Sequence, residues 1–84
     1  MSEQVKVLNP DGIHARPAGL IAKAVQDSGC ALTLSLPGAG PVDASSVMMV
    51  MTLGAQCGDV VTVECDNADV AAKVKNILQA NDDA

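Results

Sequence analysis

The residues best suited to chemistry lie in the segment DGIHARPAG, at positions 11–19. It contains His14, the only histidine of the chain, with Arg16 and Pro17 shortly after it. Proline suits the first position of a helix, so Pro17 predicts a helix over about 16–28, with the imidazole just outside it. The first N–H groups of a helix lack intrahelical partners and carry partial positive charge. Such an end, with an arginine beside it, can bind an anion such as phosphate.

The imidazole is predicted to be a nucleophile. The positive helix end disfavours a second positive charge on the ring, so one ring nitrogen keeps its lone pair. If that nitrogen attacked a phosphoryl donor, the helix N–H groups and the guanidinium of Arg16 would stabilise the new phosphate. The simpler alternative is a histidine that only caps the helix or lies on the surface.

Metal binding and hydrolysis are less well supported, and no metal or cofactor is predicted. One histidine with Asp11 does not complete a tetrahedral metal site. A hydrolase would need a third group to orient the histidine and a serine, and no motif supplies one. An odd number of cysteines without C-x-x-C spacing indicates neither a zinc site nor a disulfide framework. Reduced thiols are expected for Cys30, Cys57 and Cys65.

Composition narrows the class of protein. The 84 residues fit one domain over 1–84, with a core that must be aliphatic because the chain has no Phe, Tyr or Trp. A net charge of −5 and the lack of aromatic stacking residues argue against nucleic-acid binding. No stretch approaches the roughly 20 apolar residues that span a membrane, and the first residues do not resemble a signal peptide. We therefore expect a cytoplasmic, monomeric protein.

Hydrophobic periodicity predicts four strands and three helices in the order β-α-β-β-α-β-α. Strands are expected over 3–8, 30–36 and 60–65, with a short strand after the turn PGAGP. Helices are expected over 16–28, after the serine pair at 45–46, and after a cap at Asp66 or Asn67; the tail 81–84 should fray. This pattern predicts an α+β fold of two layers, with all helices on one sheet face. The other face should be solvated through Thr33, Ser35, Thr62 and Glu64.

The segment VMMVM, at 47–51, is ambiguous. A serine cap before it and Gly54 after it favour a short helix, while its length and composition also allow a strand. About three of its five residues are expected in the core. The others, with Val47 and Met48 among them, should form a small exposed apolar patch, and methionine packs adaptably against different partners.

The chain also resembles a known family. GIHARPA around His14, ASSVMMVMTLGAQCGD about thirty residues later and VVTVE after that are similar to HPr, the histidine-containing phosphocarrier of the bacterial phosphoenolpyruvate-dependent sugar phosphotransferase system. The likeness covers essentially the whole chain. It implies an open-faced sandwich with a four-stranded antiparallel sheet of order 1-4-2-3, covered on one face by three helices.

The resemblance further implies a function. His14 would accept a phosphoryl group through its δ1 nitrogen from phosphorylated enzyme I and pass it to the IIA component of sugar permeases, with Arg16 stabilising the phosphate. The protein would then be a carrier and not an enzyme. Partner contacts in the family map onto Val47, Met48, Met51 and Leu20.

Ser46 matches the family's regulatory serine, which a dedicated kinase phosphorylates in many Gram-positive bacteria so that the protein binds a transcriptional regulator. Many relatives have lysine directly before that serine, whereas this chain has Ser45. Asp11 also departs from the Asn or Ser common in relatives, and we expect it to turn or cap the loop with its carboxylate outward.

Two other functions stay open. A paralogous carrier of a nitrogen-related or dihydroxyacetone-kinase phosphorelay would have the same histidine segment, because the surrounding surface decides the choice of partner. A regulatory binding module with an incidental histidine is the alternative from another class.

Overall fold

Alternating apolar and polar residues form four strands in the computed structural model, which describes residues 2–80. They are β1 (Ser2–Lys6), β2 (Leu32–Leu36), β3 (Ala39–Asp43) and β4 (Val60–Cys65). Side chains of a strand point alternately to opposite faces, so the apolar set of each strand is buried on one side. β4 has the predicted bounds, and the alternation predicted for β2 is confirmed by the burial of Leu32 and Leu34.

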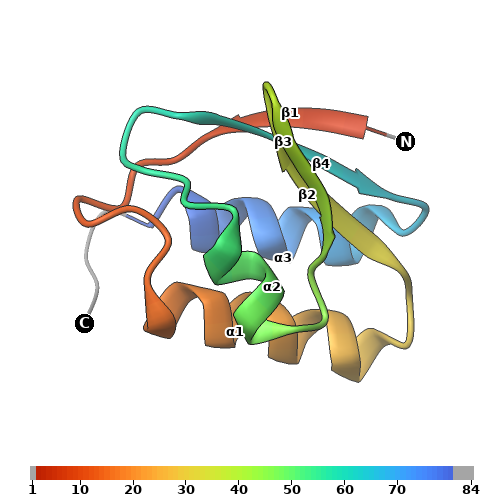
Figure 1. Cartoon of the computed structure of the whole chain (residues 1–84). Helices are drawn as coiled ribbons and strands as arrows, with labels where there is room; N and C mark the ends of the chain where they lie inside the picture. The colour runs from red at the N-terminus through yellow and green to blue at the C-terminus, as the bar shows by residue number, and fades with distance from the viewer. Residues whose placement is uncertain (1, 81–84) are drawn as a thin grey trace.

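The strands form one antiparallel sheet of order β1-β4-β2-β3 (Figure 1). Val5 lies opposite Val61, and Leu34 lies opposite Val63, so the central strand β4 aligns apolar side chains from both neighbours. A one-residue slip would turn these valines and leucines to solvent, which makes the register well determined. The predicted strand order is confirmed.

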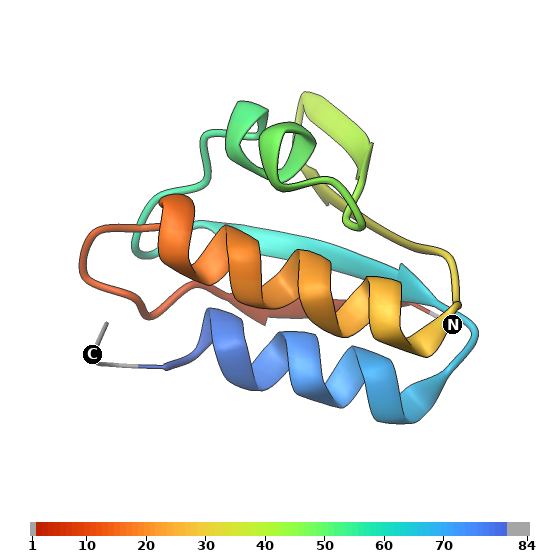
Figure 2. The ribbon, with the colours of Figure 1, turned by 90° about the horizontal axis from the view of Figure 1, so that it is seen from below.

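Three helices cover one face of this sheet: α1 (Ala15–Ser28), α2 (Val47–Thr52) and α3 (Ala68–Leu78). In Figure 1 the sheet lies above and all three helices lie below it. Figure 2 shows α1 and α3 side by side and running in opposite directions, with α2 beside α1 near β3. The two-layer prediction is confirmed, and Thr33, Ser35, Thr62 and Glu64 lie outside the core as predicted, together with the exposed Val60.

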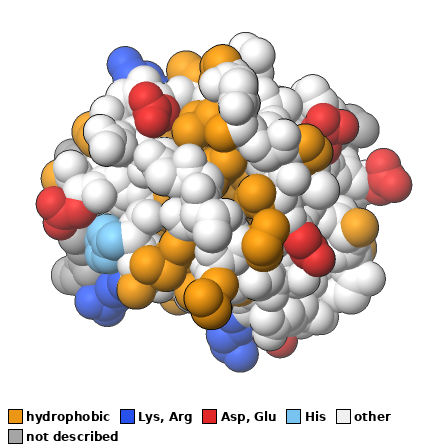
Figure 3. Space-filling model, in the orientation of Figure 1, with side chains coloured by type: hydrophobic (Ala, Val, Ile, Leu, Met, Phe, Trp, Pro, Cys, Tyr) orange, Lys and Arg blue, Asp and Glu red, His pale blue; other side chains and the backbone are white. Residues whose placement is uncertain are grey.

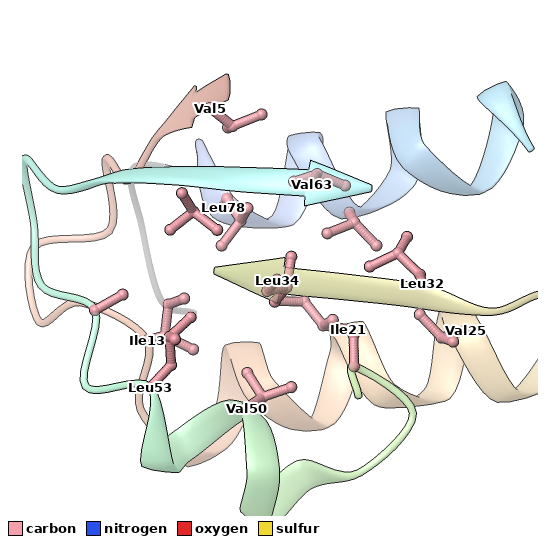
Figure 4. Packing of buried hydrophobic residues seen from close by; sticks show 14 of the residues in the cluster. Val5, Ile13, Ile21, Val25, Leu32, Leu34, Val50, Leu53, Val63 and Leu78 are labelled. Atoms are coloured by element: carbon pink, nitrogen blue, oxygen red, sulfur yellow. The ribbon is translucent and has the colours of Figure 1, made fainter. Parts of the chain in front are cut away.

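The space between the layers is filled by aliphatic side chains (Figure 4). Burying one such side chain contributes about 1.5–3 kcal/mol, so a core without aromatic rings can still hold a small fold together. Its residues come from strands, helices and the loop before α1; those labelled in Figure 4 are Val5, Ile13, Ile21, Val25, Leu32, Leu34, Val50, Leu53, Val63 and Leu78.

Three strand boundaries differ from the predictions. β1 ends at Lys6: Val7 still bonds to Gly58 and Asp59, directly before β4, but no longer in the regular ladder, and the N–H of Leu8 donates to the carbonyl of Leu78. β2 begins at Leu32 because the N–H of Cys30 donates to the hydroxyl of Ser28 at 3.0 Å. The predicted turn PGAGP is only a two-residue turn at 37–38, and the following residues already belong to β3.

Side-chain caps begin the two later helices as predicted. The Ser46 hydroxyl accepts the N–H of Met49 at 3.3 Å, which confirms a helix and not a strand for the segment after it. Asn67, and not Asp66, caps α3 by accepting the N–H groups of Asp69 and Val70. The predicted fraying of the tail 81–84 lies outside the described residues.

Candidate functional site

His14 is the N-cap residue of α1. Its backbone is extended (φ −100°, ψ −165°), and its carbonyl accepts the first intrahelical hydrogen bond, from the N–H of Ala18 at 3.0 Å. The side chain makes no capping hydrogen bond to the helix, and the residue is half-buried. The imidazole therefore lies at the helix end without capping it.

The helix starts at Ala15, slightly before the predicted start at about residue 16, and the prediction that Pro17 occupies its first position is wrong. α1 begins at Ala15, which puts Pro17 third in the helix instead of first. This position tolerates proline, because the N–H it lacks would have had no intrahelical partner. The buried ring packs under the first turn and still constrains the backbone that follows His14.

The first turn of α1 is electropositive. Ala15 and Arg16 carry N–H groups without intrahelical partners, and no acidic residue lies in this turn. The side chain of Arg16 is exposed. The start of α1 therefore combines an imidazole, helix N–H groups and an exposed guanidinium, and this combination suits a phosphate dianion.

The loop before the histidine is a tight turn. The N–H of Gly12 donates to the carbonyl of Asn9 at 3.0 Å, across Pro10 and Asp11. Proline is favoured at the second position of such turns and Asp at turn positions generally. The predicted turn is confirmed, and Asp11 lies exposed within it.

Gly12 lets this loop approach the segment after α2. Its φ is +73°, and a Cβ added there would lie 2.6 Å from the carbonyl oxygen of Ala55 and 2.8 Å from Cα of Gln56. Next to it, the N–H of Ile13 donates to the same Ala55 carbonyl at 3.0 Å. Two segments about forty residues apart are thus joined directly beside the histidine.

Asn9 anchors the loop from the other side. Its side chain is 1% exposed, and Nδ2 donates to the carbonyl oxygens of Ile77 at 2.9 Å and Leu78 at 3.3 Å, the last residues of α3. The final carbonyls of a helix need partners from outside it. The same amide therefore ends α3 and holds the loop that carries His14.

Exposed apolar side chains lie near the histidine, on α1 and α2. Leu20 is 51% exposed, Met48 is 75% exposed, and Met49 and Met51 are each 43% exposed. Figure 3 shows apolar side chains over both helices on the face that also presents the imidazole. We call these four residues the methionine patch.

The burial of the side chains of α2 differs from the prediction in two respects. Only Val50 of its VMMVM segment is fully buried, whereas about three core residues were predicted. Val47 was predicted to be exposed, yet it is half-buried against the core. Six residues make too short a helix to bury more than one narrow stripe, so all three methionines remain outside.

The start of α2 is organised by Asp43. Its Oδ1 accepts the N–H of Ser45 at 3.0 Å and the Ser45 hydroxyl at 2.8 Å. The backbone N–H and then the hydroxyl lower the pKa of Asp43. Gln26 of α1 donates to the Ser45 carbonyl at 2.6 Å, which connects this turn to α1. Because the Asp43 carboxylate binds Ser45, it lies next to the residue that precedes Ser46.

The part of the chain that the structure describes holds no candidate metal site, disulfide or membrane-spanning helix. Within residues 2–80, no group of three or more His, Cys, Asp or Glu side chains is placed to hold a metal ion. Cys30, Cys57 and Cys65 are free thiols. In the same part of the chain, every helix is too short or too polar to cross a membrane.

Sequence reasoning missed four residues of the site: Asn9, Gly12, Met49 and Ala55. Asn9 and Gly12 look like ordinary turn residues, since the partners that show their roles are far away in sequence. Ala55 carries no signal, because it acts through its carbonyl. The exposure of Met49 could have been predicted, because a helix as short as α2 buries few of its side chains.

The sequence of this chain is similar to those of known proteins. Residues 1–82 match the family model described as the PTS HPr component phosphorylation site. The phosphocarrier protein HPr of Mycoplasma genitalium is 32% identical over 81 residues, which cover 93% of this chain and 92% of that protein. The HPr of Chlamydia muridarum is 42% identical over 73 residues, covering 87% and 69% of the two chains.

The fold is also that of a solved structure. HPr-C-His from Thermoanaerobacter tengcongensis superposes with a TM-score of 0.83 over 96% of this chain and 93% of the other, at 23% identity. At this identity the likeness supports the fold alone.

Proposed function

Because the chain belongs to the HPr family of phosphotransferase-system phosphocarriers, we propose that His14 accepts a phosphoryl group from phosphorylated enzyme I and donates it to IIA components of sugar permeases. The observation that carries this proposal is the position of His14 at the N-terminus of α1, with Arg16 two residues later and no acidic side chain in the first turn. A phosphate on the imidazole would meet positive charge from the helix and from the guanidinium.

The transfer is a displacement at phosphorus. A ring nitrogen of His14 forms a new N–P bond while the bond between phosphorus and the donor's histidine nitrogen breaks, and the donor nitrogen keeps that electron pair. Such transfers depend on in-line positioning and on charge stabilisation more than on a dedicated base. Arg16 and the N–H groups of α1 would supply the charge stabilisation from this chain.

The open position of the site suits a carrier. His14 is half-buried and Arg16 is exposed, so a bound phosphate would remain accessible to a second protein. A site that enclosed the phosphate would hold it too firmly to release it. The fixed loop from Asn9 to Ile13 keeps the imidazole in place for both donor and acceptor.

The methionine patch would form the docking surface for both partners. Apolar contacts without fixed direction suit a protein that binds several others in turn. Leu20, Met48 and Met51 are available for this role, while Val47 would contribute only its exposed part.

Ser46 would be a second site of phosphorylation, by a serine kinase, and the phosphorylated protein would bind a transcriptional regulator. A phosphate there would add about −1.5 to −2 charges beside the docking surface. The carboxylate of Asp43 already lies next to the adjoining Ser45, so the phosphate would add to negative charge that is present there. Phosphorylated Ser46 would therefore weaken docking of enzyme I.

Intact mass spectrometry tests the proposal. Incubation with phosphoenolpyruvate, magnesium and sugar-system enzyme I should add one phosphoryl group that is acid-labile, absent in His14→Ala, and lost when a IIA protein is added. An acid-stable adduct, or an adduct on His14→Ala, would refute it. Phosphorylation only by a nitrogen-related enzyme I, or transfer only to a dihydroxyacetone kinase, would assign the paralogous role instead.

A further inference from the structure

Most of the thioethers of this chain are gathered at one place. The chain has four methionines, and three of them lie within the six residues of α2. Met48 is 75% exposed, and Met49 and Met51 are each 43% exposed. Exposed methionine sulfur reacts with two-electron oxidants, whereas a buried sulfur is protected.

Helix geometry directs these side chains outward together. Met48 and Met51 are three residues apart and so share one face, and Met49 flanks that face on the other side. Val50, which points in the opposite direction, is the fully buried residue of α2. Oxidation of the methionines would thus change the outer surface of α2 without placing a polar group in the core.

The inference rests on the proposed function, since this surface must then be covered during phosphoryl transfer. A protein interface buries roughly 800 Å² on each partner, which corresponds to a disc of about 16 Å radius. The molecule measures 29 × 28 × 21 Å. An interface centred on the imidazole would therefore extend over much of the face shown in Figure 3, including the apolar surface of α2.

We propose that Met48, Met49 and Met51 form an oxidation-sensitive docking surface, on which conversion to methionine sulfoxide weakens binding of phosphorylated enzyme I. Hydrogen peroxide transfers one oxygen atom to the thioether sulfur and leaves as water, so sulfur is oxidised by two electrons and the peroxide is reduced by two. Methionine sulfoxide reductase reverses the change: two thiols become a disulfide, and the oxygen leaves as water.

The physical effect is on docking and not on chemistry. A sulfoxide is polar and keeps its water, so burying it against an apolar partner costs free energy that the thioether does not cost. His14 and Arg16 are not altered. The KM for this protein as a substrate of phosphorylated enzyme I should rise, while kcat stays near the value of the reduced protein.

The test compares two proteins, each with Cys57→Ser to remove the exposed thiol. One keeps its methionines, and the other carries Met48→Leu, Met49→Leu and Met51→Leu, which preserve an apolar, helix-forming surface. Met1 is present in both and so controls for its own oxidation. Both are treated with hydrogen peroxide and then dithiothreitol, the sulfoxides are located by peptide mass mapping, and circular dichroism verifies folding.

Peroxide should raise the KM of the methionine protein about tenfold, and methionine sulfoxide reductases A and B together should restore it. The leucine protein should change little. An equal rise in the leucine protein, an unchanged KM after oxidation of the three methionines, or a loss confined to kcat would overturn the inference. If the untreated protein is not phosphorylated at all, the proposed function fails, and the inference fails with it.

Discussion

The N–H of Ile13 donates a 3.0 Å hydrogen bond to the carbonyl oxygen of Ala55. This bond joins the loop that carries His14 to the segment that leaves α2. The two sequence motifs that resemble a phosphocarrier are thereby held side by side, and this bond connects the loop that carries the imidazole to the segment that follows the methionines of α2. The next residue back, Gly12, makes this approach possible.

Replacing Gly12 by alanine should disrupt that contact. The new Cβ would lie 2.6 Å from the Ala55 carbonyl oxygen, at a residue whose φ is +73°. We expect a loss of about 2–4 kcal/mol in the free energy of unfolding, measured by urea denaturation, and slower phosphorylation of His14.

Gly29→Ala provides the matched control. Gly29 has a φ of +70°, and nothing lies within 4 Å of its added Cβ. It should lose only the backbone penalty of about 1–2 kcal/mol and keep its phosphorylation rate. Equal losses in both variants would mean that the contact with Ala55 contributes nothing.

Removal of the Asn9 side chain should destabilise the fold. Asn9→Ala removes the two hydrogen bonds to the carbonyls of Ile77 and Leu78, which keep the N–H groups of Ala80 and Leu8 as donors, at an expected cost of about 1–3 kcal/mol for the pair. Asn76→Ala, at an exposed position of α3, should change the stability by at most about 0.5 kcal/mol. Thermal denaturation of both variants makes the comparison, and similar melting temperatures would refute the anchoring role of Asn9.

Arg16 should matter for transfer and not for folding. Arg16→Ala is expected to lower kcat/KM for phosphoryl transfer by about 10- to 100-fold, because the guanidinium no longer stabilises the phosphate. Lys23→Ala removes the same charge two helical turns away, where Lys23 pairs with Asp27 at 3.5 Å. Its rate should stay within about threefold of the wild type. If the two variants lose rate equally, only general electrostatic attraction is involved.

The charge at the start of α2 should control docking. Ser46→Asp and Ser46→Asn both retain a good helix cap, so the comparison isolates the charge. The Asp variant should accept phosphate from enzyme I more slowly than the Asn variant. The two variants should differ in KM, and added salt should reduce this difference. Wild-type kinetics for Ser46→Asp would contradict the docking role of this region.

Asp43 should make stability depend on pH. Its pKa is lowered in the folded protein, first by the backbone N–H of Ser45 and then by the hydroxyl. The ionised carboxylate therefore stabilises the fold at pH values above the ordinary pKa of an aspartate. This contribution is lost as the pH falls through the lower pKa that Asp43 has in the folded protein.

Melting curves of the wild type and Asp43→Asn should accordingly differ at pH 7 and converge as the pH falls from about 4, the ordinary pKa of an aspartate, through the lower pKa of the folded state. The difference should be smaller when both proteins carry Ser45→Ala, which removes one of the two donors. A difference that stays constant with pH would show that ionisation of Asp43 is not its cause.

Local patterns predicted most of this fold. The alternation in 60–65 and the capped apolar stripe after Asn67 depend on neighbouring residues only, and both match the structure. Boundaries failed where a distant or competing partner decides: β1 ends because Leu8 bonds to Leu78, and β2 starts late because Cys30 bonds to Ser28.

The site was less predictable than the fold. The position of His14 at a helix end follows from the residues around it, although Pro17 lies third in the helix and not first. The roles of Asn9 and Gly12 depend on contacts with residues more than forty positions away, and no periodicity reports such contacts. The exposure of Met49 depends on how little of α2 the core can accept.

Locating the phosphate by NMR tests the central claim most directly. After reaction with phosphoenolpyruvate and enzyme I, ³¹P and long-range ¹H–¹⁵N spectra should show one phosphoryl group, bonded to the δ1 nitrogen of His14, with the amide resonances of Ala15 and Arg16 shifted. A phosphoryl group on Ser46, or an imidazole spectrum unchanged by the reaction, would contradict the account.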